Sequence, residues 1–269
     1  MERAMLLEGK NAVIHGGGGA IGGAVARAFA SEGATVFLAG RTRRKLDSVA
    51  EDIRKAGGAA HVAAVDALDP EAVQTHADAV AAQAGGIDIV LNAIGIPHVQ
   101  GIPLADLELS DFEDLVGAYV RAHFLIAKAS AKHIVSRGGG VILTISTPGS
   151  RMSGPGFLGY GVACGAIETF SRILAGELGP SGVRVICLRP DAMPDALATS
   201  YTGPMFGRMA EGMGMTGEEL LTRRAETMAL LRRAPKLREI ADYAAFVASD
   251  RAGAMTGAIA NLSCGSLVD

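Results

Sequence analysis

Residues 13–22 (VIHGGGGAIG) constrain the fold of this 269-residue chain more than any other stretch. They follow a short, mostly apolar run at 11–14 that is typical of a buried strand, and they lead into an alanine-rich helical pattern over 24–31. Glycines without a Cβ let backbone N–H groups approach a pyrophosphate, and the N-terminus of the next helix adds partial positive charge. The stretch therefore predicts a dinucleotide site, with a tight turn that binds no ligand as the alternative.

Strand and helix patterns alternate along the rest of the chain. The predicted strands span 11–14, 35–39, 61–65, 87–91, 140–145, 183–188 and 258–262. The predicted helices span 24–31, 45–56, 70–84, 109–133 (with Ser110 as N-cap), 160–177 and 238–249. Each parallel crossover needs a helix to return the chain, so the pattern predicts an α/β fold: one doubly wound parallel sheet (Rossmann fold) with helices on both faces. Ligands of such sheets bind beyond the carboxyl ends of the strands.

The interval 191–235 interrupts this alternation. It is rich in glycine and proline and contains six methionines, Met193, Met205, Met209, Met213, Met215 and Met228. Flexible thioethers adapt to irregular apolar ligands, so the interval, called the lid segment below, is predicted to be a mobile helical substrate lid. An oligomer contact or plain packing is the alternative. No interval resembles an interdomain linker, so residues 1–269 are predicted to form one domain.

Composition excludes several classes of protein. A net charge of -3 gives no basic footprint for nucleic acid. The three scattered cysteines match neither a disulfide framework nor a metal site, and the six histidines do not form a metal-ligand set; His61, His76 and His133 are expected at the surface. No run is long enough to span a membrane, and the N-terminal MERAMLLEGKN has no apolar core of a signal peptide. We therefore expect an unprocessed cytoplasmic protein that acts on a small molecule.

Several short motifs occur together in an order known from one family. Residues 15–22 (HGGGGAIG) match the glycine motif TGxxxGIG, and residues 92–95 (NAIG) match the motif NNAG. Asp66 follows the third predicted strand, and Pro190 begins a Pro-Asp pair where Pro-Gly is usual. The C-terminal stretch 246–257 also matches a closing helix and strand. The chain thus resembles the classical short-chain dehydrogenase/reductase family over nearly its whole length.

The resemblance implies a nicotinamide dinucleotide, and the residues after the second strand indicate which one. An NAD site usually ends this strand with an acidic residue, whereas here Gly40 is followed by Arg41, Thr42, Arg43 and Arg44. Arg41 can offer a bidentate donor pair to a 2′-phosphate, which favours NADP(H) over a merely solvated basic turn. The predicted cofactor-binding residues are Gly16, Gly18, Gly19, Ile21, Gly22, Arg41, Asp66, Ala67, Asn92, Gly95 and Pro190.

The catalytic positions match the family only in part. In the family a Ser polarises the substrate carbonyl, a Tyr transfers the proton, a Lys four residues later lowers the pKa of the Tyr, and an Asn on the long helix holds a water. Tyr160 matches the Tyr, and Thr147, thirteen residues earlier, can supply the Ser hydroxyl. Cys164 stands at the Lys position and Tyr119 at the Asn position, and the helix over 160–177 contains no lysine.

The missing ammonium has a chemical consequence. An unperturbed tyrosine has a pKa of about 10, so Tyr160 is expected to stay protonated at neutral pH and to be a poor base. It can still donate a proton to a forming alkoxide, which favours carbonyl reduction over alcohol oxidation. Arg151 or His98, both in loops beyond strand ends, could supply a positive charge instead.

Three other side chains remain ambiguous. Cys164 is either a thiolate nucleophile or thiol acid, or a buried structural residue, which is the commoner role of a lone cysteine. Tyr119 is either a second hydroxyl donor in the pocket or part of the helix packing. His123, one turn after Tyr119, is the one histidine that we consider as a site residue.

Three functions follow. The first is an NADP(H)-dependent reductase of a carbonyl in an apolar or bulky small molecule, with Tyr160 as proton donor and Thr147 polarising the carbonyl. The second is a non-redox enzyme of the same fold, catalysing dehydration, isomerisation or cyclisation. The third is a catalytically silent cofactor-binding subunit. The family resemblance also implies a homotetramer or homodimer built partly on the helices that begin near Leu109 and Tyr160.

Overall fold

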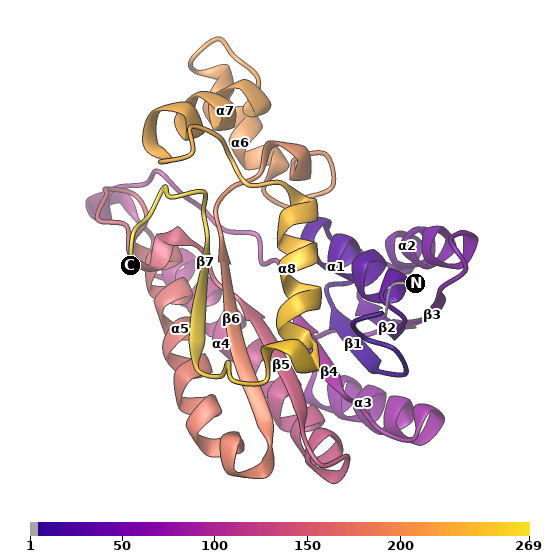
Figure 1. Cartoon of the computed structure of the whole chain (residues 1–269). Helices are drawn as coiled ribbons and strands as arrows, with labels where there is room; N and C mark the ends of the chain where they lie inside the picture. Colours follow the sequence, from indigo (N-terminus) through magenta and orange to yellow (C-terminus); the bar gives the residue numbers. More distant parts are fainter. Residues whose placement is uncertain (1–4) are drawn as a thin grey trace.

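A parallel sheet forms the centre of the computed structural model, which describes residues 5–269; the first four residues of the N-terminal segment lie outside this range. Seven strands pair in the order β3-β2-β1-β4-β5-β6-β7 among the described residues (Figure 1). Their bounds are β1 Asn11–His15, β2 Thr35–Gly40, β3 Ala59–Ala64, β4 Ile89–Asn92, β5 Gly140–Ile145, β6 Val183–Pro190 and β7 Ala258–Leu262. The order reverses between β1 and β4, which is where a doubly wound sheet opens a crevice for a ligand.

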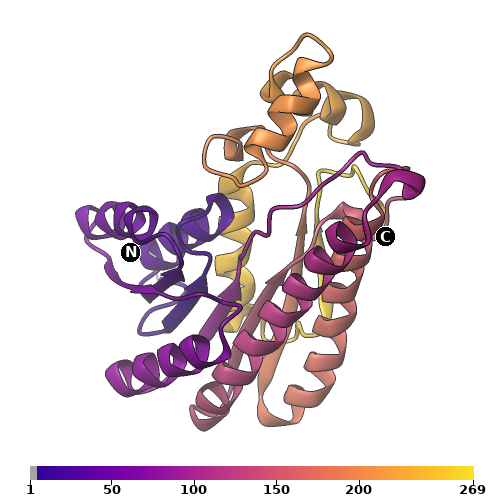
Figure 2. The ribbon, with the colours of Figure 1, turned by 180° about the vertical axis from the view of Figure 1, so that it is seen from behind.

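Helices cover both faces of the sheet. One face packs against α1 (Ala20–Ser31), α2 (Arg43–Lys55) and α8 (Leu237–Ala248), and the other against α3 (Pro70–Ala84), α4 (Leu109–Ser136) and α5 (Leu158–Leu178), as the two opposite views show (Figures 1 and 2). The predicted doubly wound fold is therefore confirmed. None of the helices in residues 5–269 combines the length and apolarity needed to cross a membrane.

Alternation along the strands separates two apolar cores. On β1, Ile14 packs in the core beneath α1 and α8, whereas Val13 faces the opposite core beneath α3 and α4. Successive strand side chains point to opposite faces, so a strand buried on both sides must be apolar throughout. Leu38 and Phe37 of β2 divide between the two cores in the same way.

The lid segment stands beyond the carboxyl ends of the strands. It leaves β6, forms a short 3-10 turn at Pro194–Ala196, and folds into α6 (Gly203–Glu211) and α7 (Gly217–Met228). Both helices project above the sheet at the top of Figure 1, before the chain returns through α8. Thr216 caps α7 with a reciprocal Thr216 to Glu219 capping box, which fixes where this helix begins.

Two local predictions were wrong. Ser110 does not cap α4. The helix begins at Leu109, its N-cap is Glu108, and Ser110 is already a helical residue. His76 is buried rather than at the surface, since it turns inward from α3 and its ring lies edge-on to His15 at 5.7 Å. Burial lowers the pKa of His15 to about 3, so this residue is neutral at the end of β1.

Candidate functional site

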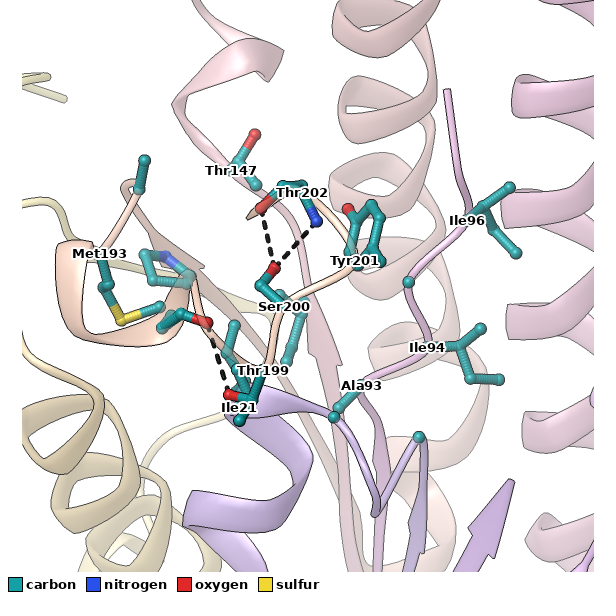
Figure 3. A pocket seen from close by; sticks show the side chains of 18 of the residues that line it. Ile21, Ala93, Ile94, Ile96, Thr147, Met193, Thr199, Ser200, Tyr201 and Thr202 are labelled. Atoms are coloured by element: carbon teal, nitrogen blue, oxygen red, sulfur yellow. Dashed lines mark hydrogen bonds between the residues drawn. The ribbon is translucent and has the colours of Figure 1, made fainter. Parts of the chain in front are cut away.

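A cavity of about 430 Å³ lies between the carboxyl ends of the strands and the lid segment (Figure 3). It runs from the glycine turn after β1, past the loops after β4 and β5, to the loop after β6. Of the site residues predicted from sequence, all line this cavity except Gly22 and Asn92. The fold thus brings together positions that lie far apart in the chain.

Gly22 and Asn92 support the glycine turn from behind. A Cβ at Gly22 would lie 2.3 Å from the carbonyl oxygen of Gly16, and one at Gly16 would lie 2.4 Å from the carbonyl oxygen of Ala93. The amide oxygen of Asn92 accepts a hydrogen bond from the N–H of Ile94 at 3.1 Å. These contacts hold the turn after β1 against the loop after β4, which requires glycine at Gly16 and Gly22.

The glycine turn fits a dinucleotide diphosphate. Gly18 and Gly19 line the cavity, and α1 begins directly after Gly19 with no side-chain cap from the residues that the structure describes. The N–H groups of the first turn are therefore available to an anion, and the helix dipole favours one there. Arg41 and Asp66, which follow β2 and β3, also line the cavity.

Tyr160 lies at the other end of the cavity beside Thr147 and Cys164. The Thr147 hydroxyl is 3.3 Å from the Cys164 sulfur and accepts a hydrogen bond from the Gly149 N–H at 3.2 Å. A Cβ at Gly149 would lie 2.9 Å from the Tyr160 ring, so the glycine lets the ring pack directly on this loop. The His98 ring stacks on the other side of Tyr160, with centroids 4.5 Å apart.

This end of the cavity is electrically neutral. Burial raises the pKa of Tyr160 well above its usual value, beyond the effect of the missing lysine, so its hydroxyl stays protonated at neutral pH. Burial also raises the pKa of Cys164 to about 11, which favours a neutral thiol over a thiolate at this position. Burial lowers the pKa of His98, so this residue does not supply a positive charge at neutral pH. Arg151 is exposed and does not line the cavity.

Tyr119 faces the cavity, and its hydroxyl lies 3.0 Å from the hydroxyl of Tyr201 in the lid segment. Sequence reasoning missed Tyr201, which follows no motif and is 82 residues away from its partner. His123 is not a wall residue: it lies behind Tyr119, where its Nδ1 contacts the Tyr119 carbonyl oxygen at 2.9 Å. Burial lowers its pKa to about 4.

A buried carboxylate that sequence reasoning also missed supports the Thr147 loop. Glu168 lies one turn beyond Cys164 on α5 and is 5% exposed. It accepts hydrogen bonds from the hydroxyls of Ser146 at 2.9 Å and Ser150 at 2.6 Å, on either side of Thr147. The guanidinium of Arg189 lies 3.6 Å away. This network fixes the backbone that presents the Thr147 hydroxyl.

The lid segment supplies an apolar roof. Its residues on the cavity wall include Met193, Leu197, Met205, Phe206 and Met209. Asp191 anchors this roof: it pairs with Arg224 of α7 at 3.0 Å and accepts a hydrogen bond from the Ser266 hydroxyl at 2.5 Å. The residue that replaces the usual glycine therefore joins the loop after β6 to α7 and to the C-terminal stretch.

Comparison with known proteins finds relatives that match most of the chain. A family model described as enoyl-(acyl carrier protein) reductase matches residues 18–266. An uncharacterized oxidoreductase of Mycobacterium tuberculosis is 37% identical over 191 residues, 70% of each chain. D-threitol dehydrogenase of Mycolicibacterium smegmatis is 29% identical over 253 residues, 94% of this chain and 90% of that protein. A solved 7α-hydroxysteroid dehydrogenase, complexed with NADH and 7-oxo glycochenodeoxycholic acid, has a TM-score of 0.82 at 25% identity, covering 99% of this chain and 97% of that chain.

Proposed function

The chain belongs to the classical short-chain dehydrogenase/reductase family of oxidoreductases, and from this premise we propose that it is an NADP(H)-dependent carbonyl reductase. Its substrate is an apolar or bulky small molecule. The observation that carries the proposal is a protonated Tyr160 beside the Thr147 hydroxyl, in one cavity with a glycine turn that fits a diphosphate.

The proposed reaction uses two hydroxyls of the chain. NADPH, when bound at the glycine turn, would supply the hydride that reduces the carbonyl carbon. Thr147 donates a hydrogen bond to the carbonyl oxygen, and Tyr160 gives its proton to that oxygen as the alcohol forms. An alkoxide is a much stronger base than a phenolate, so the transfer is favourable even though burial raises the pKa of Tyr160. A proton from solvent then restores the Tyr160 hydroxyl.

Support for NADP(H) comes from the wall after β2. Gly40 ends the strand without a carboxylate, and the exposed Arg41 and Lys45 line the cavity there. A phosphate on the adenosine ribose would meet positive charge on this side. The nearest acidic wall residue, Asp66, accepts a hydrogen bond from the Leu68 N–H, which holds its carboxylate toward its own loop.

Support for the substrate class comes from the roof of the cavity. Methionine, leucine and phenylalanine side chains of the lid segment line the same cavity as Tyr160, and Arg224, which also lines it, is paired with Asp191. An apolar carbonyl compound would bury its surface against these side chains without leaving a charge unpaired.

We also propose a cytoplasmic homodimer or homotetramer. Relatives in the family are commonly oligomeric. Exposed apolar side chains occur along α4 and α5, including Phe124, Val120, Val162 and Ile173. Exposed apolar side chains on a pair of long helices are a common feature of protein interfaces. The long helices predicted from sequence to form the contact carry these residues.

Calorimetric titration with NADPH and with NADH tests the proposal. We expect NADPH to bind more tightly than NADH, and Arg41→Ala to weaken NADPH binding roughly 10- to 100-fold, because a hydrogen-bonded charge pair is lost. Arg43→Ala is the matched control, since Arg43 pairs with Asp47 on α2 and is not a wall residue. Binding of neither dinucleotide would overturn the reductase proposal. Tight binding without turnover of any carbonyl compound would favour the non-redox enzyme or the silent subunit.

A further inference from the structure

Tyr201 occupies a central place in the cavity. It lies in the loop between the 3-10 turn at Pro194–Ala196 and α6, and its ring stands beside the loop after β4 (Figure 3). A Cβ at Gly95 would lie 2.1 Å from the Cδ1 atom of Tyr201 and 2.2 Å from its Cε1 atom. The aromatic ring therefore lies directly against the backbone of Gly95.

The position of Gly95 makes this contact significant. The loop after β4 packs on the glycine turn at Ala93, whose carbonyl oxygen nearly touches Gly16, and Gly95 lies two residues farther toward Tyr160. A dinucleotide whose diphosphate sits at the glycine turn must pass this section of wall to bring its reacting end to Tyr160. A residue without a Cβ allows a ligand to approach the backbone closely. At Gly95 a side chain of the chain itself fills that space.

Two further contacts hold Tyr201 in this place. Its hydroxyl is hydrogen-bonded to the Tyr119 hydroxyl at 3.0 Å, and its ring lies 5.9 Å from that of His98. Burial raises the pKa of Tyr201 to about 12 and that of Tyr119 well above its usual value, so both hydroxyls stay protonated and the bond persists at neutral pH.

The loop that carries Tyr201 can move without unfolding a helix. Its hydrogen bonds are local: the Ser200 hydroxyl contacts the Thr202 hydroxyl at 2.8 Å and accepts a bond from the Thr202 N–H at 3.1 Å. Tyr201 as a residue is 40% exposed, although its hydroxyl is buried against that of Tyr119. Few contacts therefore need to break for the side chain to swing out toward solvent.

We propose that Tyr201 is a gate at the nicotinamide end of the cavity, held closed by Tyr119 and displaced when the dinucleotide binds. The adenosine end, between Gly18 and Arg41, stays open in the closed state. The inference rests on the proposed function, because it assumes that a dinucleotide is the ligand. The gate predicts that a ligand spends more free energy to occupy the nicotinamide end of the cavity than to occupy the adenosine end.

The test compares two ligands on the same variants by calorimetry. NADPH must displace the gate, whereas 2′-phospho-ADP occupies the adenosine and diphosphate end alone. If only a fraction of the molecules is open, the apparent dissociation constant of a ligand that needs the open state equals its intrinsic value divided by that fraction. We expect Tyr201→Ala to tighten NADPH binding by about threefold or more and to leave binding of 2′-phospho-ADP unchanged. Tyr243→Ala, a tyrosine on α8 outside the cavity wall, is the matched control for the substitution.

Substitutions that remove only a hydroxyl distinguish the contribution of the Tyr119–Tyr201 hydrogen bond from that of the Tyr201 ring. Tyr201→Phe and Tyr119→Phe each break the same bond, so we expect each to tighten NADPH binding less than Tyr201→Ala does. Their combination is expected to have no more effect than either alone, because both remove one interaction. Thermal melts of the variants confirm that each remains folded.

The outcomes distinguish the gate from the proposed function. If Tyr201→Ala weakens NADPH binding or leaves it unchanged, while 2′-phospho-ADP binds as before, Tyr201 is not a gate and the cofactor assignment survives. If the unchanged protein binds neither ligand, the proposed function fails and the gate fails with it. If Tyr201→Ala alters binding of both ligands equally, the effect is general and the gate is refuted.

Discussion

Cys164→Lys introduces the positive charge that the family resemblance implies for this position and that this chain lacks. Cys164 lies on the cavity wall, 3.3 Å from the Thr147 hydroxyl and one helical turn beyond Tyr160. A lysine side chain there is longer than cysteine and would extend from α5 toward the cavity that Cys164 lines. We expect its ammonium to stabilise the Tyr160 phenolate and so to make Tyr160 a usable base.

The size of the effect follows from electrostatics. An ammonium about 4 Å from a phenolate contributes about 4 kcal/mol at an effective dielectric constant of 20, which corresponds to roughly 3 pKa units. Desolvation of the lysine, in a site where burial already raises the pKa of Cys164 to about 11, offsets part of this. We therefore expect the pKa of Tyr160 to fall by about 1 to 2 units and alcohol oxidation near pH 8 to accelerate roughly 10- to 100-fold.

Initial rates in both directions provide the assay, with 2-decalone and NADPH for reduction and 2-decalol with NADP⁺ for oxidation. A proton donor works below its pKa, and burial raises the pKa of Tyr160, so reduction by the unchanged protein should show no alkaline fall below about pH 9. Cys164→Met is the matched control, because it lengthens the side chain without a charge. If Cys164→Lys oxidises no faster than Cys164→Met while both bind NADPH normally, the electrostatic reasoning is refuted.

Two further predictions concern buried groups. Iodoacetamide at about pH 8 is expected to modify the half-buried Cys264 well before Cys164, whose thiol is 1% exposed and has a pKa of about 11; mass spectrometry that finds Cys164 alkylated first would contradict this. Glu168→Gln is expected to lower the free energy of unfolding by roughly 1 to 3 kcal/mol, since it removes one of the two carboxylates beside the buried Arg189 guanidinium and leaves only Asp269. Glu177→Gln on the exposed face of α5 should change it by less than about 0.5 kcal/mol. Urea titrations of the two variants would refute the account if they gave equal losses.

Periodicity in the sequence was sufficient to predict the sheet. Strands buried on both faces read as continuous apolar runs, and β5 and β7 were predicted with the bounds that the structure gives, Gly140–Ile145 and Ala258–Leu262. Capping was less predictable. A serine near a helix start is a common cap, but Ser110 lies inside the first turn of α4, whose N-cap Glu108 makes no side-chain capping hydrogen bond.

The spacing of the family motif predicted that Thr147, Tyr160 and Cys164 lie close together, because the three follow one another along one strand end, one loop and one helix. The residues that sequence reasoning missed reach the site differently. Tyr201 comes from a loop with no periodic pattern, and its contact with Tyr119 depends on where the lid segment folds back. Glu168 follows Cys164 by four residues on α5, a helical spacing that places both on one face, so this neighbour could have been found.

The substitutions around Tyr160 are physically connected. In the closed state Cys164 lies among Tyr160, Thr147 and the Tyr119–Tyr201 pair, all of them neutral. The acidic wall residues are Asp66, at the adenosine end, and Asp191, which is already paired with Arg224. A lysine at 164 would therefore be desolvated without a counterion whenever the gate is closed, which costs free energy. A neutral thiol removes that cost, so replacing lysine by cysteine stabilises the closed state at the expense of base strength. It follows that Cys164→Lys should itself loosen the gate, and that its effect on NADPH affinity should shrink when Tyr201→Ala is already present.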